Sequence, residues 1–257
     1  MTLINFIDQT PTINMALYFE KIGTSDRADK LKVALAEAGC KAWDEEGRYI
    51  KSANVALAGI GGIAISRELL EVYCEQRKTL PGASAGMSYL NPHGKSLDDL
   101  YETVVGHQHY SIAHTATANL LVAGVTVGVE NEFNSQRDIL HMSRVTVART
   151  GIQERPPIVV SSEELLEPTK KVVEYIDHIT SDIAPTKLNQ WESRNLLYPS
   201  SKATLFLATA SLRNFQKLVS QRHDTGKELE YVNTLEQISV CLASVWPELF
   251  RDEGKNK

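Results

Sequence analysis

Closely spaced histidines are the first residues in this sequence whose type and spacing suggest chemistry. His107 and His109 are separated by one residue, and His114 follows shortly after them. On a β-strand alternate residues share a face, so His107 and His109 could ligate one metal ion together. No acidic residue beside them completes a ligand set. The competing interpretation is that these imidazoles form hydrogen bonds or line a pocket.

Arginines form the second group with chemical potential. Arg137, Arg144 and Arg149 fall within one segment, and Arg194, Arg213 and Arg222 follow later in the chain. Guanidinium groups suit phosphates and carboxylates because they donate two parallel hydrogen bonds. The alternative is a solvated helical face whose arginines pair with the neighbouring acidic residues, which are Glu130, Glu132 and Asp138.

Glycines between residues 55 and 64 resemble a strand, a glycine turn and the start of a helix. Such a turn brings backbone N–H groups close to a pyrophosphate and would indicate dinucleotide binding. No second strand ending in Asp or Glu follows at the expected distance. A plain glycine-rich turn is therefore the favoured interpretation.

Composition sets the broad class of the protein. The chain has 257 residues, 42% of them hydrophobic, and a formal net charge of −5. This balance argues against a nucleic-acid coat but allows a local basic pocket for a phosphorylated ligand. Three well-separated cysteines predict neither a disulfide framework nor a cysteine zinc site, so we expect a reducing cytoplasm. We find no signal peptide, and the most apolar stretch, residues 54–65, is too short to cross a membrane.

Hydrophobic periodicity predicts a mixed α/β or α+β protein in which helices form the majority. We expect helices over 24–39, 65–73, 131–149 and 161–179, and an apolar stripe from Leu229 to Leu249 predicts another. Residues 110–129 favour a buried strand. Residues 80–86 and 91–94 are typical of turns or loops. No linker divides the chain, so residues 1–257 are predicted to form one domain.

Several motifs in the second half of the chain occur in a familiar order. These are Arg-Asn-Leu-Leu-Tyr-Pro at 194–199, a strand-like run ending in Leu-Arg-Asn-Phe at 202–215, an acidic stretch at 222–231, and Trp-Pro-Glu-Leu-Phe at 246–250. In this order they resemble the flavin-dependent thymidylate synthase family. The resemblance covers residues 109–250. It divides the chain into a divergent part, 1–105, and a thymidylate synthase-like part, 106–257.

The signature of that family is degraded here. The family has Arg-His-Arg, seven residues, and then Ser-x-Arg. Placed without gaps, this pattern falls on residues 137–139 and 147–149, where only Arg137 and Arg149 match. Val147 takes the place of the serine and, unlike a hydroxyl, cannot hydrogen-bond a pyrimidine ring.

The resemblance implies specific roles for individual residues. The flavin-contacting positions of the family correspond to His114, Arg137 and Asn214. The nucleotide-holding arginines correspond to Arg149, Arg194 and Arg222, of which Arg149 and Arg222 are also the implied catalytic residues. Glu228 lies in the acidic stretch and is the remaining implied substrate-binding residue.

The same resemblance implies a fold and an activity. The fold would be a twisted sheet flanked by long helices, assembled as a homotetramer. The activity would be flavin-dependent C5 methylation, or a related one-carbon alkylation, of a pyrimidine nucleotide other than standard dUMP. FAD would be the cofactor, with methylenetetrahydrofolate and NADPH as co-substrates. Two alternatives remain: an inactive flavin- or nucleotide-binding homologue, and a metal enzyme built on His107, His109 and His114.

Overall fold

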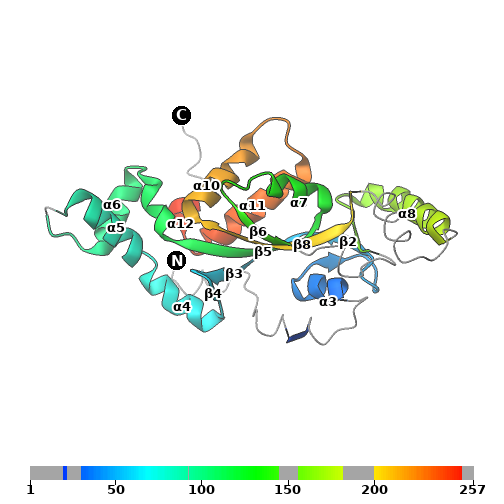
Figure 1. Cartoon of the computed structure of the whole chain (residues 1–257), viewed down its shortest axis with the longest axis horizontal. Coiled ribbons are helices and arrows are strands. Elements are labelled where there is room, and N and C mark those ends of the chain that lie inside the picture. The colour runs from blue at the N-terminus through cyan, green and yellow to red at the C-terminus, as the bar shows by residue number, and fades with distance from the viewer. Residues whose placement is uncertain (1–19, 22–29, 92, 145–155, 182–199, 251–257) are drawn as a thin grey trace.

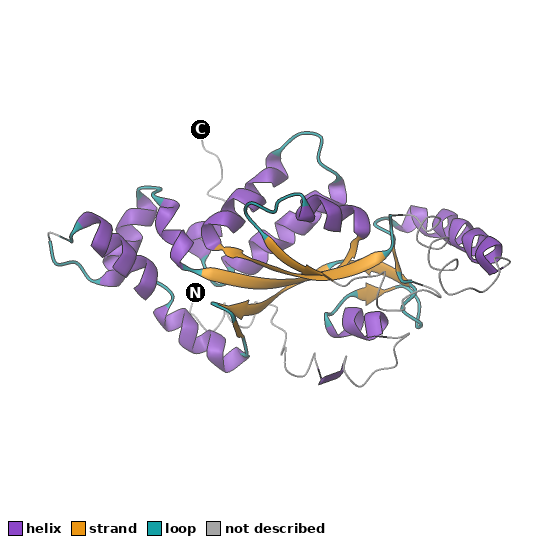
Figure 2. Ribbon diagram, in the orientation of Figure 1, coloured by secondary structure: helices purple, strands orange, loops and turns teal. Residues whose placement is uncertain are grey.

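A curled antiparallel sheet of five strands forms the centre of the computed structural model, which describes residues 20–21, 30–91, 93–144, 156–181 and 200–250 (Figures 1 and 2). The strand order is β4-β3-β5-β8-β6. In chain order the strands are β3 Asn54–Ile60, β4 Ile63–Ala64, β5 Thr117–Thr126, β6 His141–Arg144 and β8 Ala203–Ser211. The two longest strands, β5 and β8, pair from one end to the other, with a register shift between Ala123 and Val125.

Helices cover one face of this sheet and enclose the main core (Figure 1). They are α7 Val127–Asn134, α10 Leu212–Ser220, α11 Leu229–Ala243 and α12 Pro247–Phe250, with a 3-10 turn at Gln221–His223 between α10 and α11. Leu120 and Phe206 point from the sheet into this core, where they meet Phe215 and Leu235 from the helices. Burial of these large side chains supplies the main stabilisation of the fold.

A smaller layer covers the other face of the sheet. Helix α3, Lys30–Glu37, packs Leu31 and Leu35 against Leu121 and Leu205. Next to it lies a three-stranded sheet of order β1-β2-β7, formed by Lys41–Ala42, Tyr49–Ser52 and Ile158–Val159. Helix α8, Leu166–Ser181, follows a 3-10 turn at Glu163–Leu165 and packs against this small sheet.

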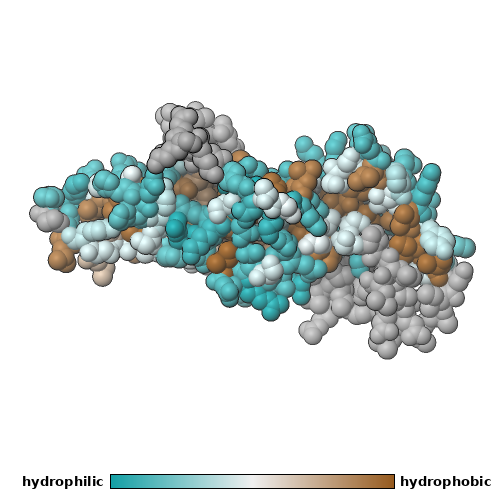
Figure 3. Space-filling view, turned by 90° about the horizontal axis from the view of Figure 1, so that it is seen from above, coloured by the Kyte–Doolittle hydropathy of each residue, from teal (hydrophilic) through white to brown (hydrophobic). Residues whose placement is uncertain are grey.

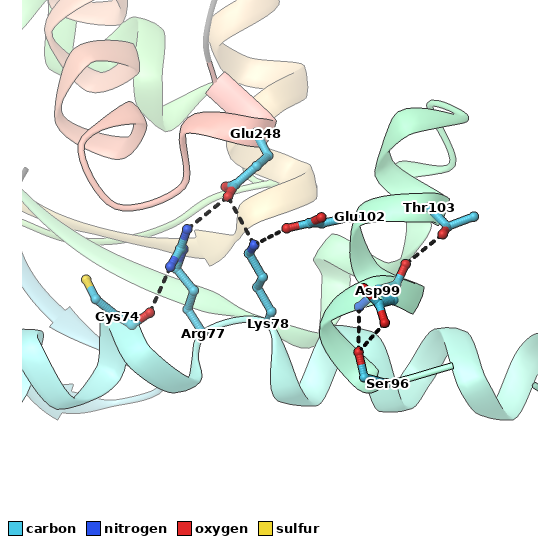
Figure 4. Close-up of polar contacts among 8 residues, drawn as sticks. All are labelled: Cys74, Arg77, Lys78, Ser96, Asp99, Glu102, Thr103 and Glu248. Atoms are coloured by element: carbon cyan, nitrogen blue, oxygen red, sulfur yellow. Dashed lines mark hydrogen bonds and ion pairs between the residues drawn. The ribbon is translucent and has the colours of Figure 1, made fainter. Parts of the chain in front are cut away.

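Three helices form an arm that extends from one end of the molecule (Figure 1). They are α4 Arg67–Gln76, α5 Thr79–Tyr89 and α6 Leu97–Gly106, and the 3-10 helix Tyr110–Thr115 then leads into β5. Ion pairs attach this arm to α12 (Figure 4). Arg77 lies 2.9 Å from Glu248, and Lys78 lies 2.6 Å from Glu102 and 3.8 Å from Glu248.

Four of the five predicted helices are confirmed in whole or in part. The predicted helices at 65–73 and 161–179 are α4 and α8, and the stripe from Leu229 contains α11. Helix α3 confirms the carboxy-terminal part of 24–39, whereas residues 24–29 lie outside the described part. Pro168 is tolerated because it occupies the first turn of α8, where its missing N–H would have no intrahelical partner.

The loop prediction for residues 80–86 is wrong, because they belong to α5. Pro81 lies in the first turn of the helix, where it is tolerated. Gly82 allows α5 to approach α6 closely, since an added Cβ would lie 2.1 Å from the carbonyl oxygen of Leu97. The glycine therefore serves helix packing and does not end the helix.

Two predictions around β5 are also wrong in their boundaries. Residues 110–129 contain a 3-10 helix, strand β5 and the start of α7 instead of one strand. The helix predicted over 131–149 ends at Asn134, and residues 141–144 form β6 as a partner of β8. Pairing with β8 thus overrides the local helical pattern, and residues 145–149 lie outside the described part.

The glycine-rich segment is a hairpin. Strands β3 and β4 pair through a two-residue turn in which Gly61 and Gly62 have φ values of 58° and 80°. Glycine favours such a turn because both positions need positive φ. A dinucleotide fingerprint is excluded here, since a strand and not a helix follows the glycines. Among the described helices, none is long and apolar enough to cross a membrane.

Helix α6 ends in a hydrogen-bonded cap that places His107 and His109 in a turn, so they do not lie on a strand. The backbone N–H of Gln108 donates to Val105 O at 2.8 Å, and that of His109 donates to Val104 O at 3.0 Å. This pattern is a Schellman motif, which needs a left-handed residue and is usually filled by glycine. Gln108 takes that position with φ 59°.

We predict that Gln108→Gly increases the free energy of unfolding by about 0.5–1 kcal/mol, because glycine adopts the left-handed conformation without the Cβ penalty. Thermal and urea denaturation followed by circular dichroism measure the change. Gln76→Gly at the exposed end of α4 is the control, and it should destabilise the protein. Equal effects from the two substitutions would contradict the assignment of strain to Gln108.

Candidate functional site

The amino-terminal end of α10 joins the residues predicted to contact a flavin. Ser211 caps the helix, since its Oγ accepts a hydrogen bond from the backbone N–H of Asn214 at 3.2 Å. A second hydrogen bond of 3.1 Å links that Oγ to Nδ1 of His114. The backbone N–H of Leu212 donates to Ala116 O, so the segment carrying His114 is fixed beside the start of α10.

The turn between α7 and β6 meets the same end of α10. The side-chain Nδ2 of Asn214 donates to Ile139 O at 3.0 Å. Two residues earlier, Arg137 is exposed, and its Nε donates to Asn134 O at 3.3 Å. His114, Arg137 and Asn214 therefore lie on three segments that converge at one helix terminus.

This convergence produces a local environment suited to anions. The amino-terminal end of a helix carries partial positive charge and N–H donors. His114 and Arg137 are both exposed beside it and add donors that reach solvent. The arrangement can hold a phosphate-bearing ligand without a positive net charge on the whole chain.

The opposite ends of β5 and β8 carry a buried carboxylate. Glu130 on α7 has a side chain that is only 5% exposed, yet both of its oxygens are satisfied. Oε1 accepts from Nη1 of Arg144 at 2.9 Å, and Oε2 accepts from the Thr204 hydroxyl at 2.6 Å. The Arg144 side chain remains 46% exposed, so one side of its guanidinium is fixed while the rest faces solvent.

A second carboxylate fixes α11 to the start of α7. Glu230 accepts hydrogen bonds from the backbone N–H and the hydroxyl of Thr126, both at 2.9 Å. Thr126 in turn caps α7 by accepting from the N–H of Val129. Burial raises the pKa of Glu230, and the hydrogen bonds from Thr126 oppose this shift in part.

The other predicted substrate residues are separate from the α10 terminus or lie outside the described part. The Arg222 side chain is 7% exposed, with Nη1 donating to Val219 O and Nε 3.4 Å from Glu236. Glu228 is exposed at the amino-terminal cap of α11 and forms no capping bond with its side chain. Arg149, Arg194 and Val147 lie outside the described residues.

His107, His109 and His114 do not form a metal centre within the described residues. Among those residues, no three His, Cys, Asp or Glu side chains are arranged to hold a metal ion. His109 is instead hydrogen-bonded through Nδ1 to the hydroxyl of Tyr89 at 3.0 Å. His114 bonds to Ser211 and is thus engaged at α10.

Comparison with known proteins gives a clear result only at the level of three-dimensional structure. No family model and no curated protein sequence match the chain. In contrast, a Helicobacter pylori flavin-dependent thymidylate synthase, ThyX, complexed with FAD and dUMP superposes with a TM-score of 0.58 at 13% identity. That likeness covers 77% of this chain and 98% of the ThyX chain. The chain has the fold of the flavin-dependent thymidylate synthases.

A second neighbour is a methylase of UMP and dUMP. The UMP/dUMP methylase PolB from Streptomyces cacaoi, bound with 5-Br UMP, superposes with a TM-score of 0.56 at 13% identity, covering 79% of this chain and 94% of PolB. These shares exceed the stretch from 106 to 257, so the structural likeness extends into the first 105 residues. The predicted α+β architecture is therefore confirmed over more of the chain than the motifs cover.

Sequence reasoning missed the hydrogen bonds of Glu130 with Thr204 and of Glu230 with Thr126. The alternative interpretation of the arginines included an ion pair with Glu130, and the structure confirms one for Arg144. The pair forms between α7 and β6, however, and not along one helix. Thr204 lies 74 residues from Glu130 in the sequence, so no local pattern announces their hydrogen bond.

We predict that Glu230→Gln flattens the dependence of stability on pH. Because its pKa is raised in the folded state, Glu230 stabilises the fold most below its unfolded pKa, and that contribution is lost as pH rises through the folded pKa. Urea denaturation at several pH values from about 4 upward measures this slope. The exposed Glu75→Gln is the control, and a slope unchanged by Glu230→Gln would contradict the prediction.

Proposed function

We propose that this protein is a flavin-dependent enzyme that methylates, or transfers a related one-carbon unit to, C5 of a pyrimidine nucleotide other than standard dUMP. The observation that carries the proposal is the convergence of His114, Arg137 and Asn214 at the start of α10, within a thymidylate synthase fold. The family resemblance of the sequence implies flavin contacts at these positions.

The residues at α10 fit FAD by their chemistry. His114 and Arg137, beside the positive end of the α10 dipole, offer donors for the phosphates of a dinucleotide cofactor. Asn214 keeps the turn carrying Arg137 in place through its bond to Ile139 O. FAD supplies hydride chemistry when bound, with NADPH as the reductant and methylenetetrahydrofolate as the carbon donor in our proposal.

A nucleotide clamp made of Arg149, Arg194 and Arg222, with Glu228 beside them, completes the proposed site. Guanidinium groups would hold the phosphate and stabilise charge that develops on the ring. Both structural neighbours are complexed with pyrimidine nucleotides, dUMP in ThyX and 5-Br UMP or 5-Br dUMP in PolB, which supports a pyrimidine nucleotide as the substrate class of this chain.

We further propose a homotetramer in the cytoplasm. Several large apolar side chains on α4 and α5 are exposed in the single chain, including Val72, Leu80 and Met87. Exposed apolar side chains on neighbouring helices are typical of surfaces that are covered in an assembly.

The first functional prediction concerns FAD itself. Arg137→Ala should weaken FAD binding by about 1.5–3 kcal/mol, because a charged hydrogen bond to the cofactor is lost. Quenching of FAD fluorescence on titration with protein measures the affinity. Arg67→Ala on α4, which removes another exposed arginine, is the matched control and should leave the affinity unchanged. Wild-type protein that neither quenches nor retains FAD would refute the proposed function.

A second prediction concerns the nucleotide. Methylation of dUMP should be slower than in a family member with the motif serine by about a hundred- to a thousandfold, because Val147 cannot donate a hydrogen bond to the ring. Val147→Ser should recover part of this rate, and Val147→Thr should recover less. Product formation from dUMP and from UMP, with FAD, NADPH and methylenetetrahydrofolate supplied, measures both effects.

The prediction about dUMP can also be tested in cells, by growth of a thymidine-requiring strain that carries the wild-type gene. Robust growth without thymidine would show that dUMP is the substrate and that Val147 does not limit the reaction. Tight FAD and nucleotide binding without turnover of either nucleotide would instead favour the inactive homologue, which the replacement of the motif serine by Val147 also supports.

A further inference from the structure

A pocket of about 230 Å³ opens on the helical arm, between α5, α6 and the loop that joins them. Leu100 and Val104 from α6 provide apolar walls, and Tyr89 and His109 provide aromatic ones. The rings of Tyr89 and His109 have centroids 6.4 Å apart and are tilted by 60°. The space-filling view from above shows apolar residues among hydrophilic ones at the end of the molecule formed by the arm (Figure 3).

Backbone strain is concentrated around this pocket. Leu90, Asn91 and Gln108 have positive φ values of 57°, 36° and 59°, and within the described ranges they are the non-glycine residues that do. Asn91 lines the pocket, Leu90 follows Tyr89, and Gln108 separates His107 from His109. Such strained residues persist only where the surroundings hold them, and they are enriched at binding sites.

The rim of the pocket carries donors and no acid. Lys95, His93 and His107 line it, and no Asp or Glu is among its described lining residues. The Lys95 ammonium donates to the Thr103 hydroxyl at 3.1 Å, which leaves two of its N–H groups for a ligand. His93 and His107 are exposed histidines at the mouth.

Two of the carboxylates of α6 are engaged in other contacts (Figure 4). Asp99 accepts a hydrogen bond from the Ser96 hydroxyl at 2.7 Å, and Glu102 pairs with Lys78. They therefore do not neutralise Lys95 by direct contact.

Two residues of the rim, Asn91 and Lys95, are joined to each other in the absence of a ligand. Two hydrogen bonds join them, from Asn91 Nδ2 to Lys95 O at 3.0 Å and from the N–H of Lys95 to Asn91 Oδ1 at 2.9 Å. Preorganisation of this kind reduces the entropic cost of binding.

We propose that this pocket binds a small organic anion with a flat apolar body, of the aromatic monocarboxylate class. The ring would lie between the aromatic and aliphatic walls, and the carboxylate would meet Lys95 and the imidazoles at the mouth. The volume suits one ring and is below the range of pockets for larger ligands. This inference is independent of the proposed nucleotide chemistry.

Benzoate is the probe, and benzamide is its neutral counterpart of the same shape. Titration of the full-length wild-type chain by isothermal calorimetry should show saturable benzoate binding and at least about tenfold weaker benzamide binding. Lys95→Met should weaken benzoate binding by about tenfold or more. Lys41→Met, which removes another exposed lysine on β1, should leave it unchanged. Circular dichroism confirms that both variants are folded.

Four outcomes of the calorimetric titrations overturn the proposal. They are the absence of saturable benzoate binding, equal affinity for benzamide, equal weakening by Lys95→Met and Lys41→Met, and full displacement of benzoate by an equal concentration of inorganic phosphate. Sedimentation velocity provides a further check. If benzoate changes the oligomeric mass, the pocket is a contact between copies of the chain and the proposal is wrong.

Discussion

The antiparallel register of β5 on β8 is the constraint on which the rest of the structure depends. At one end Thr117 pairs with Ser211, which places the segment carrying His114 beside the start of α10. At the other end Thr126 pairs with Ala203, which brings α7 to Thr204 and positions the buried Glu130. One strand pair therefore sets the geometry of both polar regions.

Elements with a strong intrinsic pattern could be predicted from the sequence, and those fixed by tertiary contacts could not. Helix α11 keeps an apolar face through its whole length, so periodicity reveals it. Helix α5 was missed because Pro81 and Gly82 are typical of turns, although close packing on Leu97 requires the glycine. Strand β6 is short and mostly exposed, and only its pairing with β8 defines it.

In the candidate site, too, some residues could be predicted from sequence motifs, whereas other contacts are formed only by the tertiary structure. His114 and Asn214 were assigned from motifs, and the structure brings them to one helix terminus through Ser211. The contact between Glu130 and Thr204 could not be predicted, since it joins residues that are distant in sequence and carry no shared motif. Buried carboxylates of this kind are tolerated because both oxygens receive hydrogen bonds.

Packing of side chains on both faces of the sheet stabilises the register of β5 on β8. Leu120 and Phe206 face the helical core, whereas their neighbours Leu121 and Leu205 face the layer of α3. A slip of one residue would exchange these faces, and it would also separate Thr117 from Ser211. Because both faces are packed with side chains of different size, such a slip is costly. The hydrophobic cores therefore stabilise both the fold and the position of His114 beside α10, because both depend on this register.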